Sequence, residues 1–444
     1  MGKAFLSRSL YILGLTVVFA ALAAAQTSPA DQVTEFEVNG MKVLVKRRPS
    51  APTVAGGIYI RGGSRNLTEK DQGIESLMLA SATDAGTKFS RAQVRRELSR
   101  TGSAISGASN RDFGAIAFAT TRPNFDRVWD IFTDVVLTPA FDSADIERNR
   151  TQLQTGLREA ETSPESALQS NIDRIIYAGH PYANDPSGTP ATLASLTPEQ
   201  IKAYHKRVMQ TSQLLMVFVG DLDPADMKAR ITKAFGQLPR GNYVDRPAAP
   251  LQFTKPTVNV IARPGLPTNY IEGVFAAPSL ADPDYYPMRI AMAVLQSLVY
   301  QEVRVRRQLS YAPGAEMDNY QANTANITVT STDANQSVEV MLEQMQFLRE
   351  RTLLDEVLGE IADNFLTTYY LGQETSAAQA AELARYELIG GGWRNSFEFI
   401  NKMHQVTGRD VNAVANKYMK DLRFVVVGDP KAVNESVFLK STAN

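Results

Sequence analysis

Alternating and continuous apolar runs divide the first half of the chain into short strands and helices. Residues 36–38 and 42–46 flank Asn39-Gly40, a pair typical of a tight turn, and they predict a β-hairpin. Helical spacing of the apolar residues predicts a helix at 124–137. The same reasoning gives strands at 54–61, 103–110, 113–120 and 214–219, and helices at 75–82, 91–100, 143–160 and 165–177.

The second half of the chain repeats this plan. The segment LLMVFVGDLDP at 214–224 corresponds to LRFVVVGDP at 422–430, and each closes its half with an apolar strand. Each half also opens with a glycine-containing strand, at 56–60 or 273–276, followed by an apolar helix. The repeat predicts a duplicated α+β unit. Because strands come in consecutive pairs, we expect two homologous domains, each a mostly antiparallel sheet with helices packed on one face.

Length and composition set the domain boundaries. A chain of 444 residues exceeds one typical core, and residues 239–256 contain several prolines with little apolar periodicity. We therefore expect an N-terminal domain at 26–238, a linker at 239–256 and a C-terminal domain at 257–444.

The first 25 residues have the features of a secretory signal peptide. Lys3 and Arg8 precede an apolar run at 10–22, and three alanines at 23–25 form a small-residue cleavage site. The run is short for a membrane span, although an uncleaved anchor is the alternative. The expectation is an exported protein without stable membrane insertion, periplasmic if the source is Gram-negative.

Charge and residue counts exclude several functional classes. The formal net charge of −1 argues against a nucleic-acid binder. The absence of cysteine excludes a disulfide scaffold and a lipid anchor through cysteine. The histidines are His180, His205 and His404, and none has a second histidine one helical turn away, so they cannot form a zinc helix.

Three segments carry a resemblance to a known family. They are GIESLMLASATDAGT at 73–87, YAGHPYANDPSGTPATLASLTPEQ at 177–200 and EVRVRRQLSYAPGAE at 302–316. In this order the chain resembles the insulinase/pitrilysin-like metallopeptidases from about residue 33 to residue 437. The resemblance implies two homologous domains and assembly with a partner of the same build around a substrate peptide.

The zinc-binding positions of that family are substituted. Its inverted motif, His-x-x-Glu-His, places the two histidines at Ser76 and Ala80, the glutamate base at Leu79 and the third ligand at Gly156. Leucine, alanine and glycine offer no side-chain donor, and a neutral serine hydroxyl is a poor ligand. The resemblance thus implies that this chain holds no zinc and no other cofactor, and that it does not hydrolyse peptides alone.

A second family feature is retained in the C-terminal half. The family carries an arginine and a tyrosine seven residues apart, which fall on Arg304 and Tyr311. The resemblance implies that this pair serves the zinc site of a facing partner. A guanidinium and a phenol can donate hydrogen bonds to a tetrahedral oxyanion or to an adjacent peptide carbonyl. The alternative is a solvated basic run, Arg304-Arg306-Arg307, beside a packed tyrosine.

The main hypothesis is a non-zinc subunit of an exported heterodimeric zinc metallopeptidase. It donates Arg304 and Tyr311 to a homologous subunit that has an intact His-x-x-Glu-His motif and holds the zinc. The alternative is a catalytically inert peptide-binding or structural homologue, and an unrecognised metallopeptidase site ranks last. We interpret residues 110–112 as a turn in preference to a substrate-binding edge, and Gly390–Gly392 as a turn between helices.

Overall fold

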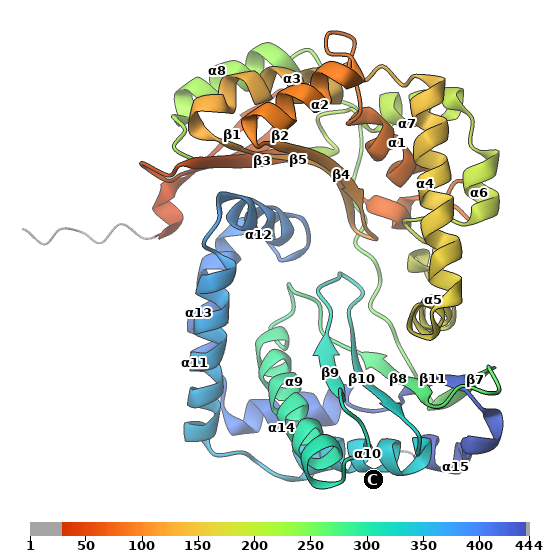
Figure 1. Ribbon diagram of the computed structural model, residues 1–444. Coiled ribbons are helices and arrows are strands. Elements are labelled where there is room, and N and C mark those ends of the chain that lie inside the picture. Colours follow the sequence, from red (N-terminus) through yellow and green to blue (C-terminus); the bar gives the residue numbers. More distant parts are fainter. Residues whose placement is uncertain (1–28, 441–444) are drawn as a thin grey trace, which may run out of the picture.

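The structure, a computed structural model, describes residues 29–440, so the predicted signal peptide at 1–25 lies outside the described residues. Figure 1 shows two β-sheets, one in each half of the chain, with helices around them. Within residues 29–440, no helix is both long enough and apolar enough to cross a bilayer.

The N-terminal half contains a six-stranded sheet with the order β1-β2-β6-β3-β5-β4. Only β2 and β6 pair in parallel. At the predicted hairpin, Asn39 and Gly40 both have positive φ, as a primed two-residue turn requires. The strands are β1 (Val33–Val38), β2 (Met41–Arg47), β3 (Thr53–Arg61), β4 (Ala104–Ser109), β5 (Phe113–Thr121) and β6 (Leu214–Gly220). The helices are α1 (Ile74–Ala82), α2 (Arg91–Thr101), α3 (Phe125–Leu137), α4 (Ser143–Thr162), α5 (Pro164–Ile176), α6 (Pro190–Ser195), α7 (Pro198–Val208) and α8 (Pro224–Phe235).

The C-terminal half contains a five-stranded sheet with the order β7-β11-β8-β10-β9. Its strands are β7 (Thr257–Ala262), β8 (Asn269–Ala276), β9 (Gly314–Met317), β10 (Thr324–Ser331) and β11 (Arg423–Gly428). Its helices are α9 (Tyr285–Val299), α10 (Ala334–Glu350), α11 (Asp355–Gly372), α12 (Ser376–Ile389), α13 (Phe399–His404), α14 (Gly408–Tyr418) and α15 (Glu435–Phe438).

The two sheets share one strand plan. Strands β2, β6, β3, β5 and β4 occupy the same places in the first sheet as β7, β11, β8, β10 and β9 in the second. Each sheet has one parallel pair and is otherwise antiparallel. The predicted fold class, a duplicated and mostly antiparallel α+β unit, is confirmed.

Each sheet also receives a helix from the opposite half on its second face. Helix α12 packs on β3 and β6 of the first sheet, and α5 packs on β8 and β11 of the second (Figure 1). Strand β6 is buried along its whole length. Its alternate residues belong to two cores: Met216 and Phe218 face the N-terminal helices, whereas Leu215 and Val217 join the cluster that contains α12. The two halves therefore share their cores.

Polar contacts fix the two halves to each other. The Tyr182 side chain is 1% exposed, and its hydroxyl donates to Asp112. The same hydroxyl accepts the N–H groups of Gln321 and Ala322, both at 3.2 Å, from the loop between β9 and β10. Residues 239–256 contain no helix or strand and run along this boundary, where Asp245 pairs with Arg65 at 2.7 Å.

Buried acidic groups gather where α5 meets the second sheet. Glu272 on β8 is 7% exposed and lies near Asp318 and Asp173. Asp173 pairs with Arg111 at 3.0 Å, and Asp318 accepts a hydrogen bond from a threonine, but no cation is paired with Glu272 among the described residues. Burial, with the neighbouring carboxylates, raises the pKa of Glu272 to about 7.

Glu272 makes stability depend on pH in a defined direction. Its carboxyl stays protonated to about pH 7 in the folded protein, whereas a glutamate exposed to water in the unfolded chain has a pKa of 4.5. The stability that this difference contributes is complete below pH 4.5 and is lost as the pH rises through 7, at a cost on the order of 3 kcal/mol. We expect Glu272→Gln to raise the urea midpoint of unfolding at pH 8 and to change it little at pH 4.

Glu360→Gln is the control, because that carboxyl lies on the exposed surface of α11 and its removal uncovers no buried group. An equal gain for Glu272→Gln at both pH values would contradict the assigned cause.

The free edges of the two sheets differ. On β9, the N–H of Ala315 donates to Gln296 Oε1 at 2.6 Å, and Gln296 Nε2 donates to the carbonyl of Pro313 at 3.4 Å. Arg289 also donates to the carbonyl of Met317. Side chains of α9 thus occupy the hydrogen-bonding groups of this edge. Within residues 29–440, no comparable hydrogen bond reaches the outer edge of β4.

Removing the Gln296 amide should expose the β9 edge to strand pairing, which commonly leads to self-association. We expect Gln296→Leu to increase light scattering at a fixed protein concentration. Gln346→Leu adds the same apolar side chain at an exposed position of α10 without opening a strand edge. Equal scattering by both variants would show that exposed leucine, and not the open edge, causes association.

Candidate functional site

Ser76 lies in the first turn of α1 and is held by a nearby loop. The helix starts after Gly73, whose φ of +87° and close approach to Gly188 favour glycine. The Ser76 hydroxyl donates to the carbonyl of Pro186 at 2.6 Å. The side chain at the first expected ligand position therefore anchors the loop that carries Pro186.

Leu79 and Ala80 follow on the same helix. Leu79 is fully buried and contacts Gly107 and Gly114, where strands β4 and β5 come close to α1. A methyl group built on Gly107 would lie 2.7 Å from the Leu79 carbonyl oxygen, so the helix and the sheet are tightly packed here. Ala80 is half-buried and offers only a methyl group. The position expected for a catalytic glutamate is thus part of the hydrophobic core.

Gly156 lies on α4, the helix that packs beside α1. Asn149, two helical turns earlier on the same face, donates to the Ser81 hydroxyl of α1. Gly156 is exposed, and no atom outside its own helix lies within 4 Å of where its Cβ would be. The space for a third ligand exists, but no side chain fills it.

These positions do not fit a zinc ion. Zinc sites use cysteine, histidine, aspartate or glutamate. Within residues 29–440, no group of three such residues is arranged to hold a metal. The one polar side chain at the four positions is Ser76, and it is already bound to Pro186.

A buried acid beside these positions was not anticipated from sequence. Glu75 is 1% exposed and accepts hydrogen bonds from Tyr204 on α7 and from Ser109 on β4, the latter at 2.7 Å. Burial raises its pKa above the usual range, although both hydrogen bonds act in the opposite direction. Glu75 therefore connects α1, α7 and the sheet. The sequence signal for this buried acid was a glutamate in a helix that is otherwise made of apolar and small residues.

Arg304 and Tyr311 lie together on the surface of the second half. The chain beyond α9 forms a π-helix, Tyr300–Arg306, which carries Arg304. Arg304 Nη1 donates to the carbonyl of Tyr311 at 2.7 Å, and its guanidinium carbon lies 3.9 Å from the centre of the Tyr311 ring. Tyr311 is 79% exposed. Arg304 is half-buried, so the two residues form a preformed pair at the surface in which the tyrosine faces solvent.

The neighbouring arginines have a different environment. Arg306 and Arg307 both pair with the Glu302 carboxylate. The local positive charge is therefore partly neutralised. This contrast separates Arg304 from the rest of the basic run.

The three histidines lie in unrelated places. His180 contacts the carbonyl of Ala249, and His205 that of Val136, while His404 lies 3.8 Å from Asp363. Burial lowers the pKa of His205, so it is neutral near pH 7. Among the described residues, none of the three forms a hydrogen bond or ion pair with Arg304 or with α1.

Two further segments have structural roles. Asn110 Oδ1 accepts the N–H groups of Asp112 and Phe113, so residues 110–112 form a turn as predicted. Arg111 and Asp112 then lie buried at the boundary between the halves. Gly390–Gly392 follow α12 with positive φ at Gly391 and Gly392 and lead into a 3₁₀ turn.

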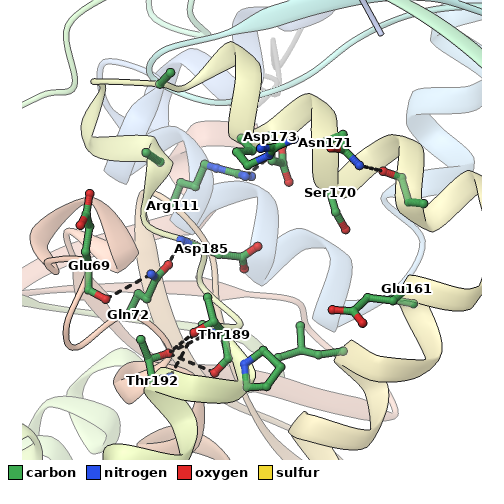
Figure 2. Close-up of a pocket in the computed structure, with 18 of the residues that line it drawn as sticks. Glu69, Gln72, Arg111, Glu161, Ser170, Asn171, Asp173, Asp185, Thr189 and Thr192 are labelled. Carbon is green, nitrogen blue, oxygen red and sulfur yellow. Dashed lines mark hydrogen bonds and ion pairs between the residues drawn. The ribbon is translucent and has the colours of Figure 1, made fainter. Parts of the chain in front are cut away.

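A polar cavity of about 1050 Å³ lies between α4, α5 and the loop that precedes α6 (Figure 2). Most of its polar side chains are already paired: Arg111 with Asp173, Gln72 with the N–H of Asp185, and Asn171 with a carbonyl of its own helix. No histidine lines it. The cavity offers hydrogen-bonding capacity but no nucleophile with an adjacent base.

Comparisons with known proteins agree with this fold. The family described as "Insulinase (Peptidase family M16)" matches residues 42–189, and "Peptidase M16 inactive domain" matches residues 195–362. Mitochondrial-processing peptidase subunit beta of Blastocladiella emersonii is 20% identical over 94% of this chain and 92% of its own length. An uncharacterized zinc protease of Mycobacterium tuberculosis is 21% identical over 85% of this chain and 88% of its own.

Solved structures show the same fold. A peptidase M16 inactive domain from Pseudomonas fluorescens superposes with a TM-score of 0.80 at 18% identity, covering 89% of this chain and 98% of that one. A protease from Helicobacter pylori also gives 0.80, at 16% identity, with 89% and 99% covered. Together with the family matches along both halves, these findings show that the chain belongs to the insulinase (M16) family of peptidases.

Proposed function

We propose that this protein is the non-zinc subunit of a two-chain zinc metallopeptidase. It completes the peptide chamber and presents Arg304 and Tyr311 to the zinc site of a homologous partner. The observation that carries the proposal is a contrast between two sites. Within the described residues, the positions expected to hold zinc have no donor set, whereas the half-buried Arg304 and the exposed Tyr311 form a pair with a defined geometry.

The chemistry of the pair suits this role. Hydrolysis of a peptide bond develops negative charge on the former carbonyl oxygen. Only one N–H of Arg304 is bonded within the described residues, which leaves the others available to a substrate. The exposed Tyr311 hydroxyl is a second donor. Donors oriented before the reaction stabilise such charge without reorganisation in the transition state.

The names of the relatives favour a partner. Mitochondrial-processing peptidase subunit beta and bovine cytochrome b-c1 complex subunit 1, which is 22% identical over 61% of this chain, are both subunits by name. A partner with an intact His-x-x-Glu-His motif would supply the zinc, which activates water and polarises the carbonyl. Strand β4, with its open edge beside α1, is the place where an extended peptide could pair.

Removing either donor should lower turnover by the reconstituted pair. We expect Arg304→Ala to reduce kcat for a quenched peptide by about 10²-fold, the scale for one lost oxyanion donor. Tyr311→Phe removes the hydroxyl but keeps the ring on Arg304, so it isolates the phenol. The measurement is steady-state kinetics with the zinc-bearing homologue.

Arg306→Ala is the matched control, since Arg306 lies on the same π-helix but pairs with Glu302. Assembly of every variant is checked by size-exclusion chromatography. Variants of Arg304 and Tyr311 that assemble and retain full activity would refute the assigned role.

The purified chain should not bind zinc stoichiometrically, because its ligand positions carry no metal-binding side chains. We expect equilibrium dialysis followed by elemental analysis to find no specific zinc. Ser76→His combined with Ala80→His and Gly156→Glu should create zinc binding, because α1 and α4 keep their relative placement.

The same triple substitution with Gly156→Gln serves as the control, since it lacks the third anionic ligand. Stoichiometric zinc in the unaltered chain would remove the main support for the proposal.

A further inference from the structure

The π-helix brings a second aromatic ring to Arg304. Its backbone hydrogen bonds span five residues, as in the 3.2 Å bond from the N–H of Arg307 to the carbonyl of Glu302. Such wide turns are rare and are found frequently at functional sites. Within this turn the ring centre of Tyr300 lies 5.2 Å from the guanidinium carbon of Arg304. Arg304 is therefore within cation–π distance of two tyrosine rings, Tyr300 and Tyr311.

Tyr300 does not behave as an ordinary core residue. Its side chain is 38% exposed, whereas Val303, on the same π-helix, is fully buried and provides the packing. No hydrogen bond of the Tyr300 hydroxyl is found within residues 29–440. The contact that depends on an aromatic ring at position 300 is therefore the cation–π contact with Arg304.

The contacts of Arg304 leave its conformation dependent on these rings. A single hydrogen bond, from Nη1 to the Tyr311 carbonyl, joins the guanidinium to the described residues. Arg304 is half-buried, and a long side chain at the surface that is held by one hydrogen bond retains rotamer freedom. A second ring restricts that freedom without occupying any N–H group, because a cation–π contact uses the flat face of the guanidinium.

We propose that Tyr300 is a positioning residue, whose ring holds the Arg304 guanidinium in the orientation in which its unbonded N–H groups face a substrate peptide. This inference rests on the proposed function for its catalytic consequence, but the contact itself can be tested without it. The ring carries the effect and the hydroxyl does not. Phenylalanine therefore preserves the role, and leucine, of similar apolar character, abolishes it.

The first measurement uses the purified chain alone. Nitrogen-15 relaxation gives the order parameter of the Arg304 Nε–H group, identified by the signal that disappears in Arg304→Lys. We expect Tyr300→Leu to lower this order parameter and Tyr300→Phe to leave it unchanged. Equal order in the Tyr300→Leu variant and the unaltered chain would overturn the inference.

The second measurement is a double-mutant cycle in the reconstituted pair with the zinc-bearing homologue. We expect Tyr300→Leu to lower kcat about two- to fivefold with little change in KM, the scale of an exposed cation–π contact. Tyr300→Phe should restore the rate. In an Arg304→Ala background, Tyr300→Leu should have no further effect, because the group it orients is absent.

The outcomes separate the two claims. The same loss from Tyr300→Leu with and without Arg304 would show a general structural role and overturn the inference. A strong effect of Arg304→Ala with none from Tyr300→Leu would overturn the inference and leave the proposed function standing. Full activity of Arg304→Ala would overturn the proposed function, and the order parameter would then decide the positioning role alone.

Discussion

The exchange of α5 and α12 between the two sheets is the constraint on which the rest of the structure depends. Each helix follows a long helix of its own half and then covers the open face of the other sheet. Apolar residues of α5 and α12 pack against alternate residues of β11 and β6, so neither half completes its core alone. Around these contacts lie the buried hydrogen bonds of Tyr182 and the acidic group at Glu272. Helices α1 and α4 belong to the N-terminal half, whereas Arg304 and Tyr311 lie on the surface of the C-terminal half, and the exchange holds these two halves together.

Much of this fold is readable from sequence, and the reasons are local. The tight hairpin turn requires positive φ at both central positions, and Asn39 and Gly40 adopt it more readily than other residues. The continuous apolar run of β6 indicates burial on both faces. The residues that cover its second face come from α12, far along the chain, and no local pattern encodes that pairing. For the same reason Arg111 and Asp112 are recognisable in sequence as part of a turn, but their burial between the halves is not.

The candidate site divides in the same way. The lack of metal-binding side chains at Ser76, Ala80 and Gly156 is visible in the residue types, and within residues 29–440 no group of three candidate ligands is arranged to hold a metal. The contact of Arg304 with Tyr311 depends on a π-helix, whose backbone pattern has no simple sequence signature. The role of Glu75 is hidden in the sequence because its two partners come from a strand and a helix that are distant along the chain. Residue types thus indicate the chemistry of the site, whereas its geometry depends on tertiary contacts.

The proposed function of this chain depends on a second chain. In the proposed function, a zinc-bearing subunit would supply the metal, and this chain would supply the donors and half of the chamber. The most direct test is the rate of hydrolysis of a quenched peptide by the purified chain, by a zinc-bearing homologue from the same organism, and by their mixture. If this chain is the non-zinc subunit, it has no activity alone, and the mixture is far more active than the homologue alone. A mixture that only matches the homologue would contradict this proposal.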